Sequence, residues 1–169
     1  MVVGVSGLRA QAPVPQHPQL LAAVRPMTGQ LRALHDELQS ALKENGAISQ
    51  LQVSNMQAKF LMKLVWAADI TEKLGSFLET VDVSPSSQTS TAALQQVEAL
   101  MVEIRQGNER LQSWLPSLSV PEQTAIAKVD LVTRWRGILE LNASVYQARP
   151  RMSWGAELSQ HVTNWFLSH

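Results

Sequence analysis

Apolar residues recur at spacings of three and four over most of this chain. Between residues 28 and 45 the repeat consists of Leu31, Leu34, Leu38 and Leu42. Because an α-helix turns once in about 3.6 residues, such positions share one helical face, whereas a β-strand needs a period of two. No alternation with a period of two holds for more than a few residues elsewhere. The spacing therefore predicts an all-α fold, with a first helix over about residues 28–45.

The same spacing predicts four further helices. They cover about residues 48–82, 91–115, 119–147 and 153–166. The fourth begins at "SLSVPEQ", where Ser119 and Glu122 have the spacing of a capping box. Helices joined by short loops are typical of an antiparallel bundle. We therefore expect an antiparallel bundle of four to five helices.

Two segments interrupt the helical pattern. Residues 1–18 hold three prolines and few large apolar residues, which predicts a flexible N-terminal arm. Leu20, Leu21 and Val24 are expected to dock as a short turn before Pro26. The polar run "SPSSQTST" predicts a linker near residues 83–91. Residues 19–169 are then expected to form a single helical-bundle domain.

The stretch "NMQAKFLMKLVWAADI", residues 55–70, is the densest apolar run in the chain. Between Phe60 and Ala68 only Lys63 is polar. Nine helical residues rise about 13 Å, well short of the ~30 Å hydrocarbon core of a bilayer, so the run is not a membrane span. Apolar groups around nearly the whole helix predict burial on several sides. The residues expected in the core are Phe60, Leu61, Leu64, Val65 and Ala68.

The charges balance over the chain and within each half of it. There are 14 basic and 14 acidic residues, with seven of each sign before and after position 88. Neither half has the positive field that drives binding to nucleic acid, so no nucleic-acid partner is expected. Cysteine is absent, which excludes disulfides and cysteine-ligated zinc. The N-terminus has no basic region before its apolar residues, so the chain is expected in the cytoplasm or exported without a conventional signal peptide.

Residues that could carry out catalysis are scattered. Asp36 and Glu37 adjoin His35, but on a helix they are expected to point away from it, and no metal site is predicted. Asp69 and Lys73 are expected to form an ion pair one helical turn apart. No glycine-rich phosphate loop is present. We therefore predict no catalytic residue, no metal and no cofactor.

Four arginines lie near the end of the fourth predicted helix. They are Arg134, Arg136, Arg149 and Arg151, and Trp135 separates the first two. Guanidinium groups bind carboxylate and phosphate through two parallel hydrogen bonds, so the cluster predicts a site for an anion or an acidic partner. The other interpretation is a solvated face with favourable charge near a helix C-terminus.

Aromatic residues concentrate near the C-terminus. The last predicted helix has an apolar stripe of Trp154, Leu158, Val162, Trp165 and Phe166. A helix this short gains its stability from packing. The stripe therefore either closes the bundle or forms a partner-binding face, with Trp154, Trp165 and Phe166 as its anchors.

Two tryptophans outside this stripe, Trp114 and Trp135, are expected to pack between helices. Asn108 is the polar exception on the apolar face of the third predicted helix. It is either a partly wet position near the helix end or a buried amide that fixes register or partner choice.

The segment "LRALHDELQSALKENGAISQLQVSNMQAKFLMKLVWAADITEKLGSFLETV" resembles the helical hairpin of bacterial type III secretion inner-rod proteins. In both, a helix is followed by a polar turn and a long helix with a Leu-Gln start and a lysine in its middle. The resemblance covers about 50 of the 169 residues. In that family the hairpin ends the chain, whereas here residues 83–169 follow it. The resemblance implies a bacterial secretion-associated or effector protein, for which the N-terminal arm would suit an export signal.

The sequence as a whole favours a non-catalytic bundle that acts through protein–protein contact. One alternative is an inner-rod-like secretion component. Others are an enzyme whose site is assembled from scattered polar residues, and a small-ligand binder that uses a tryptophan-lined space between helices.

Overall fold

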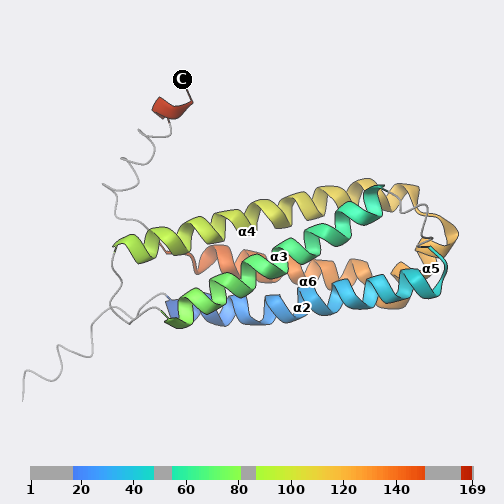
Figure 1. Ribbon diagram of the computed structural model, residues 1–169, viewed down its shortest axis with the longest axis horizontal. Coiled ribbons are helices and arrows are strands. Elements are labelled where there is room, and N and C mark those ends of the chain that lie inside the picture. The colour runs from blue at the N-terminus through green and yellow to red at the C-terminus, as the bar shows by residue number, and fades with distance from the viewer. Residues whose placement is uncertain (1–16, 48–54, 81–86, 151–164, 169) are drawn as a thin grey trace, which may run out of the picture.

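Long helices run back and forth along one axis in the computed structural model, which describes residues 17–47, 55–80, 87–150 and 165–168 (Figure 1). In chain order they are α2 (His17–Glu44), α3 (Asn55–Thr80), α4 (Ser87–Trp114), the 3-10 turn η1 (Leu115–Ser117), α5 (Val120–Val129) and α6 (Leu131–Gln147). Successive long helices point in opposite directions, and the short α5 lies at the end where α4 finishes. The predicted all-α antiparallel bundle is confirmed.

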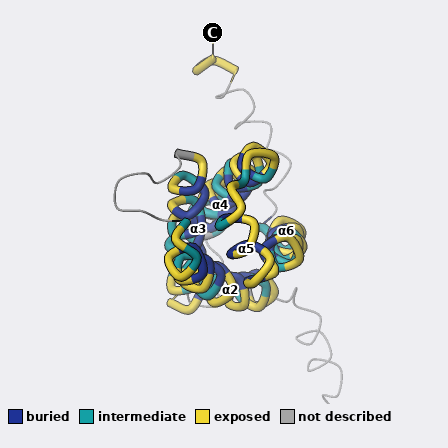
Figure 2. Tube along the Cα trace, turned by 90° about the vertical axis from the view of Figure 1, so that its right-hand side faces the viewer, coloured by how far each residue is buried: buried dark blue, intermediate teal, exposed yellow. Residues whose placement is uncertain are grey.

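The buried side chains face the axis of this bundle. Figure 2 looks along it and shows buried positions turned inward and exposed positions turned outward. The apolar face of α2 contributes Leu20, Val24, Met27, Leu31, Leu34, Leu38 and Leu42, all without exposed surface. This face packs against α3, α5 and α6, while α3 also packs against α4. The predicted leucine face of residues 28–45 is therefore the central part of the core.

The first helix begins earlier than the sequence predicted. It starts at His17 and continues through Pro26, so the expected short turn before this proline is wrong. A proline inside a helix removes one backbone hydrogen bond and crowds the preceding turn. Leu20, Val24 and Met27 are nevertheless fully buried on one face on both sides of it. Their packing offsets the local cost. Residues 1–16 of the predicted arm lie outside the described residues.

The fourth predicted helix is two helices. Asp130 has φ 52° and ψ 50°, the left-handed conformation, and its N–H donates to the carbonyls of Ala127 and Ile126 at the end of α5. Aspartate adopts this conformation more readily than most residues. The break lets Val129 and Leu131, on either side of it, both be buried. A continuous helix over 119–147 was therefore wrong.

One further helix boundary differs from the prediction, and the last predicted helix is described only in part. Helix α4 begins at Ser87, so it includes residues expected in the linker near 83–91. Of the last predicted helix, only residues 165–168 are described, and Trp165 to Leu167 are helical there. The remaining part, residues 151–164, lies outside the described residues.

The dense apolar run on α3 is buried on one side. Phe60, Leu61, Leu64 and Ala68 are buried as predicted, but Val65 is only half-buried. Met62 and Trp66 are 41% and 43% exposed, so the expected burial on several sides is wrong. The reason is that α3 packs mainly against α2 and α4 and has a face toward solvent.

An aromatic cluster joins the helices near the α5 end. The ring of Phe60 lies 5.9 Å from that of Trp114 and 5.5 Å from that of Trp135, measured between centroids. Both tryptophans are buried, which confirms that they pack between helices. The Trp135 indole N–H donates to Asn108 Oδ1 at 3.0 Å. Asn108 is therefore a half-buried acceptor that ties α4 to α6.

The second indole of the cluster is satisfied by a buried carboxylate. Trp114 Nε1 donates to Glu122 Oε2. The other oxygen, Glu122 Oε1, accepts from the backbone N–H and the hydroxyl of Ser119, at 3.1 and 2.9 Å. The capping box predicted from Ser119 and Glu122 is present at the start of α5. Glu122 thus caps α5 and also binds the end of α4.

We expect Leu64→Ala to lower the free energy of unfolding by about 2–5 kcal/mol, because Leu64 is fully packed and its loss leaves a cavity. Met62→Ala, two residues away on the exposed face of the same helix, should change it by no more than about 0.5 kcal/mol. Urea denaturation of both variants checks this. Equal losses would show that the two faces of α3 are not distinct.

A pair of glycines tests the contact between α4 and α6. A Cβ atom at Gly107 would lie 3.0 Å from Trp135 Cη2, whereas one at Gly137 would meet nothing within 4 Å. Both glycines are helical, so alanine gains about 1 kcal/mol of helix propensity at either site. Overpacking costs about 1–3 kcal/mol. We therefore expect Gly137→Ala to melt higher than Gly107→Ala by several degrees in a thermal scan, and the reverse order would contradict the packing described.

Candidate functional site

Most of the ion pairs among the described residues link one helix to another. Arg25 binds Glu79, and Arg32 binds Glu72 and, at 3.5 Å, Asp69. Asp69 thus pairs with Arg32 across helices, and the predicted pair of Asp69 with Lys73 is wrong. These side chains are about half exposed, and such pairs contribute roughly 0–1 kcal/mol each. They are structural links.

A more buried ion pair joins α3 to α4. Lys63 Nζ lies 2.9 Å from Glu103 Oε2 and also donates to Gln106 Oε1. The side chains of Lys63 and Glu103 are only 11% and 19% exposed. The same ammonium lies 4.4 Å from the ring centre of Trp66. The lysine in the middle of the apolar run is therefore held by three groups. Its partners on α4 could not be predicted from local sequence patterns, because they lie about 40 positions away in the chain.

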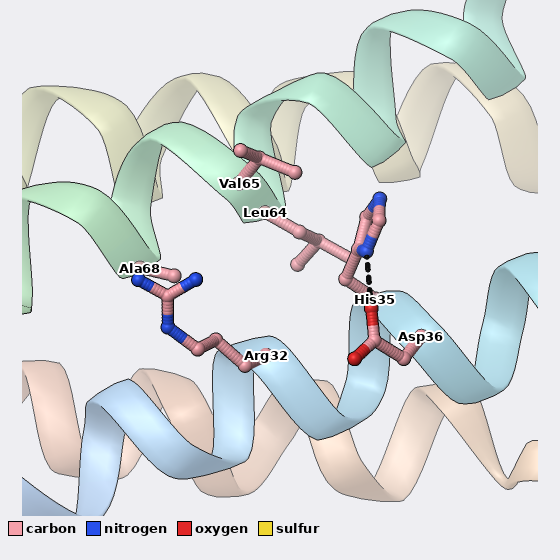
Figure 3. A pocket seen from close by; sticks show the side chains of 6 residues that line it. All are labelled: Arg32, His35, Asp36, Leu64, Val65 and Ala68. Carbon is pink, nitrogen blue, oxygen red and sulfur yellow. Dashed lines mark hydrogen bonds and ion pairs between the residues drawn. The ribbon is translucent and has the colours of Figure 1, made fainter.

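A small cavity lies between α2 and α3 (Figure 3). Its volume is about 60 Å³, and it is lined by Arg32, His35, Asp36, Leu64, Val65 and Ala68. His35 Nδ1 lies 2.9 Å from Asp36 Oδ1, so the expectation that these side chains point apart is wrong. Ligand pockets usually measure about 300–1,000 Å³. This cavity is too small for an organic substrate.

Two open grooves border α2. One, of about 350 Å³, is lined by Asp36, Glu37, Ser40, Ala41, Glu44, Lys128 and Val129. Its carboxylates are engaged, because Glu37 binds Arg134 at 2.6 Å and Glu44 binds Lys128. The other, of about 290 Å³, is lined by Gly29, Gln30, Ala33, Arg134, Gly137 and Ile138. Neither groove presents a pair of carboxylates poised for acid–base chemistry.

The three described arginines of the predicted cluster do not converge. Arg134 is half-buried and faces α2, where Glu37 holds it. Arg136 is exposed, and two residues along a helix turn it to nearly the opposite side. Arg149 lies 3.6 Å from the ring centre of Tyr146 and donates to the Tyr146 carbonyl at 2.7 Å. Arg151 lies outside the described residues. Arg134, Arg136 and Arg149 therefore form no common anion site.

The C-terminal aromatic residues are exposed where they are described. Trp165, Phe166 and Leu167 are 57%, 70% and 82% exposed. The Trp165 and Phe166 rings contact each other edge to face, with centroids 5.1 Å apart. Trp154 lies outside the described residues, as do Leu158 and Val162. Three consecutive large apolar side chains thus face solvent, which is unusual for a surface segment without a binding role.

Among the described residues, no three histidine, aspartate or glutamate side chains gather closely enough to hold a metal ion. None of the described helices combines the length and the apolar run that a membrane span requires. No protein-family model, curated protein or solved structure gives a significant match to this chain.

Proposed function

We propose that this protein is a non-catalytic helical bundle that binds a partner protein through its C-terminal aromatic segment. The observation that carries the proposal is the exposure of Trp165, Phe166 and Leu167 in succession. Aromatic side chains contribute most strongly to protein interfaces because they bury a large area with few rotatable bonds. The hydrophobic core of the described residues includes none of these three side chains, which supports the proposal.

The narrower role, a bacterial secretion-associated or effector protein, rests on the resemblance of residues 31–81 to an inner-rod hairpin. Helices α2 and α3 are adjacent and antiparallel, as such a hairpin requires. Their apolar faces also pack against α4 and α6, so the hairpin is one half of a larger bundle. In that role the protein would be made in the cytoplasm and exported without a conventional signal peptide.

Site-specific photo-crosslinking in the cells that produce the protein tests the proposal. A benzophenone amino acid at Leu167 should capture a partner, whereas one at Thr124, exposed on α5, should not. The double substitution Trp165→Ala and Phe166→Ala should reduce this capture about tenfold or more, since each buried aromatic is worth more than ~1 kcal/mol in an interface.

The melting temperature of the double variant provides the control. Because both side chains are exposed, we expect it to change by less than about two degrees. A drop of ten degrees or more would mean that the segment packs on the bundle as a structural element. The partner-binding role would then be wrong, as it would be if Leu167 captured no more than Thr124.

A further inference from the structure

A single residue separates α5 from α6. Asp130 follows Val129, the last residue of α5, and precedes Leu131, the first residue of α6. Among the described residues it is the one non-glycine residue with a positive φ. Its side chain makes no capping hydrogen bond to α6. The left-handed backbone is therefore maintained by the packing of the two helices on either side of it.

The local sequence favours a continuous helix through this position. Between Pro121 and Gly137 the chain contains no glycine and no proline. The left-handed conformation costs free energy for any residue with a Cβ atom. A right-handed Asp130 would join α5 and α6 into one helix over residues 120–147. Local preference and tertiary packing thus oppose each other at one position, as they do in elements that have two conformations.

The two halves of such a helix would carry their apolar faces on opposite sides. The buried apolar side chains are Ala125, Ile126 and Val129 on α5, and Leu131, Trp135, Ile138 and Val145 on α6. At about 100° per residue, positions 129 and 131 point about 200° apart, and the centres of the two groups differ by a similar angle. A straight helix within one bundle could bury only one of the faces. A single chain therefore needs the break.

A second copy of the chain removes this restriction. Helix α6 can leave its own bundle and take the same place in the second bundle, while α5 stays packed against its own α2. The contacts of α6, such as Arg134 with Glu37 and Trp135 with Asn108, are then made between chains and are otherwise unchanged. The hydrogen bonds of Glu122 join α5 to α4 and remain within one chain. Both apolar faces of the straight helix are buried in this arrangement.

The exchange loses few contacts at the hinge itself. Helix α5 lies across the end of the bundle, and it contacts α6 less extensively than it contacts α2 (Figure 1). The turn from α4 into α5 keeps its shape, because the cap at Ser119 lies at the other end of α5. The change is therefore confined to the backbone of Asp130, which passes from the left-handed to the right-handed conformation.

We propose that Asp130 is the hinge of a domain-swapped dimer in which two copies of this chain exchange α6. Exchange of an identical element between two copies reuses the contacts of the monomer. In each copy residues 120–147 form one helix. Aspartate tolerates the left-handed conformation better than most residues, which favours the single-chain form. The C-terminal aromatic residues take no part, so this proposal stands or falls independently of the proposed function.

Two substitutions at the hinge shift the balance in opposite directions. Glycine adopts the left-handed conformation freely, whereas alanine disfavours it and favours the helix. The preference should differ about tenfold per hinge, and each dimer contains two hinges, so Asp130→Ala should dimerise about a hundredfold more tightly than Asp130→Gly. Gly137→Ala is the matched control. It raises helix preference within α6 equally in both forms and should leave the dissociation constant unchanged.

Analytical ultracentrifugation after refolding measures this constant. Each protein is unfolded in urea and refolded at concentrations from about 5 to about 500 µM, since dimer formation follows mass action. Refolding is needed because α6 must leave the core before it can be exchanged. Far-UV circular dichroism checks that each variant recovers the helix content of the parent.

Cross-linking distinguishes an exchanged helix from a dimer formed by surface contact. The chain has no cysteine, so introduced cysteines are its only thiols. Glu37→Cys with Arg134→Cys places thiols on α2 and α6 where the two side chains contact each other. A bismaleimide should link this pair between chains in the Asp130→Ala dimer and within one chain in the monomer. In a denaturing gel the first product runs as a dimer.

A second pair provides the control for the cross-link. Arg25→Cys with Glu79→Cys lies on α2 and α3, which stay together in both forms, so it should link within one chain throughout. Three outcomes would overturn the proposal. The first is an equal dissociation constant for Asp130→Ala and Asp130→Gly. The second is an Asp130→Ala protein that stays monomeric at every concentration. The third is a dimer in which the pair at positions 37 and 134 links within one chain.

Discussion

Two buried indole N–H groups must each find an acceptor where α3, α4, α5 and α6 meet, and the arrangement of the bundle depends on how they do so. A buried N–H without an acceptor would cost roughly 1–3 kcal/mol. Trp135 uses the side-chain oxygen of Asn108, and Trp114 uses the carboxylate of Glu122. Each acceptor belongs to a different helix from its donor. The hydrogen bonds therefore set the relative positions of α4 and α6 and of α4 and α5.

Glu122 shows how one side chain can satisfy several such requirements. A buried carboxylate is costly unless it receives hydrogen bonds. Here it receives them from the Trp114 indole and from both the backbone and the hydroxyl of Ser119. Because Ser119 begins α5, the turn from α4 into α5 is fixed by the same contacts. That turn returns the chain toward α2, against which α5 and α6 then pack.

Local signals in the sequence predicted the parts of this fold that depend on neighbouring residues. The leucine spacing of α2, the capping box at Ser119 and the burial of Phe60 all follow from short-range patterns. The left-handed Asp130 did not, because a run of helix-forming residues surrounds it and only tertiary packing of Val129 and Leu131 favours the break. Burial of the dense apolar run on several sides of α3 was expected for the same kind of reason. Trp66, on the outer face of this helix, is exposed instead. Its exposure depends on how many helices pack around α3.

The candidate surfaces show the same limit. Arg134 and Arg136 looked equivalent in the sequence, yet Glu37, which is 97 positions away in the chain, binds the first, while the second is exposed on another side of α6. Trp165 and Phe166 were recognised as candidates from their residue types. Their exposure could not be predicted, because it depends on which helices pack against the C-terminal segment.

Hydrogen exchange of the tryptophan indole N–H groups, followed by NMR on the full chain, tests most directly the claim that the C-terminal aromatic residues lie outside the core. The five tryptophans give five separate indole signals. The account predicts that Trp114 and Trp135 exchange only through global unfolding, while Trp66 and Trp165 exchange at rates typical of solvent-exposed groups. A Trp165 indole protected as strongly as those of Trp114 and Trp135 would contradict it.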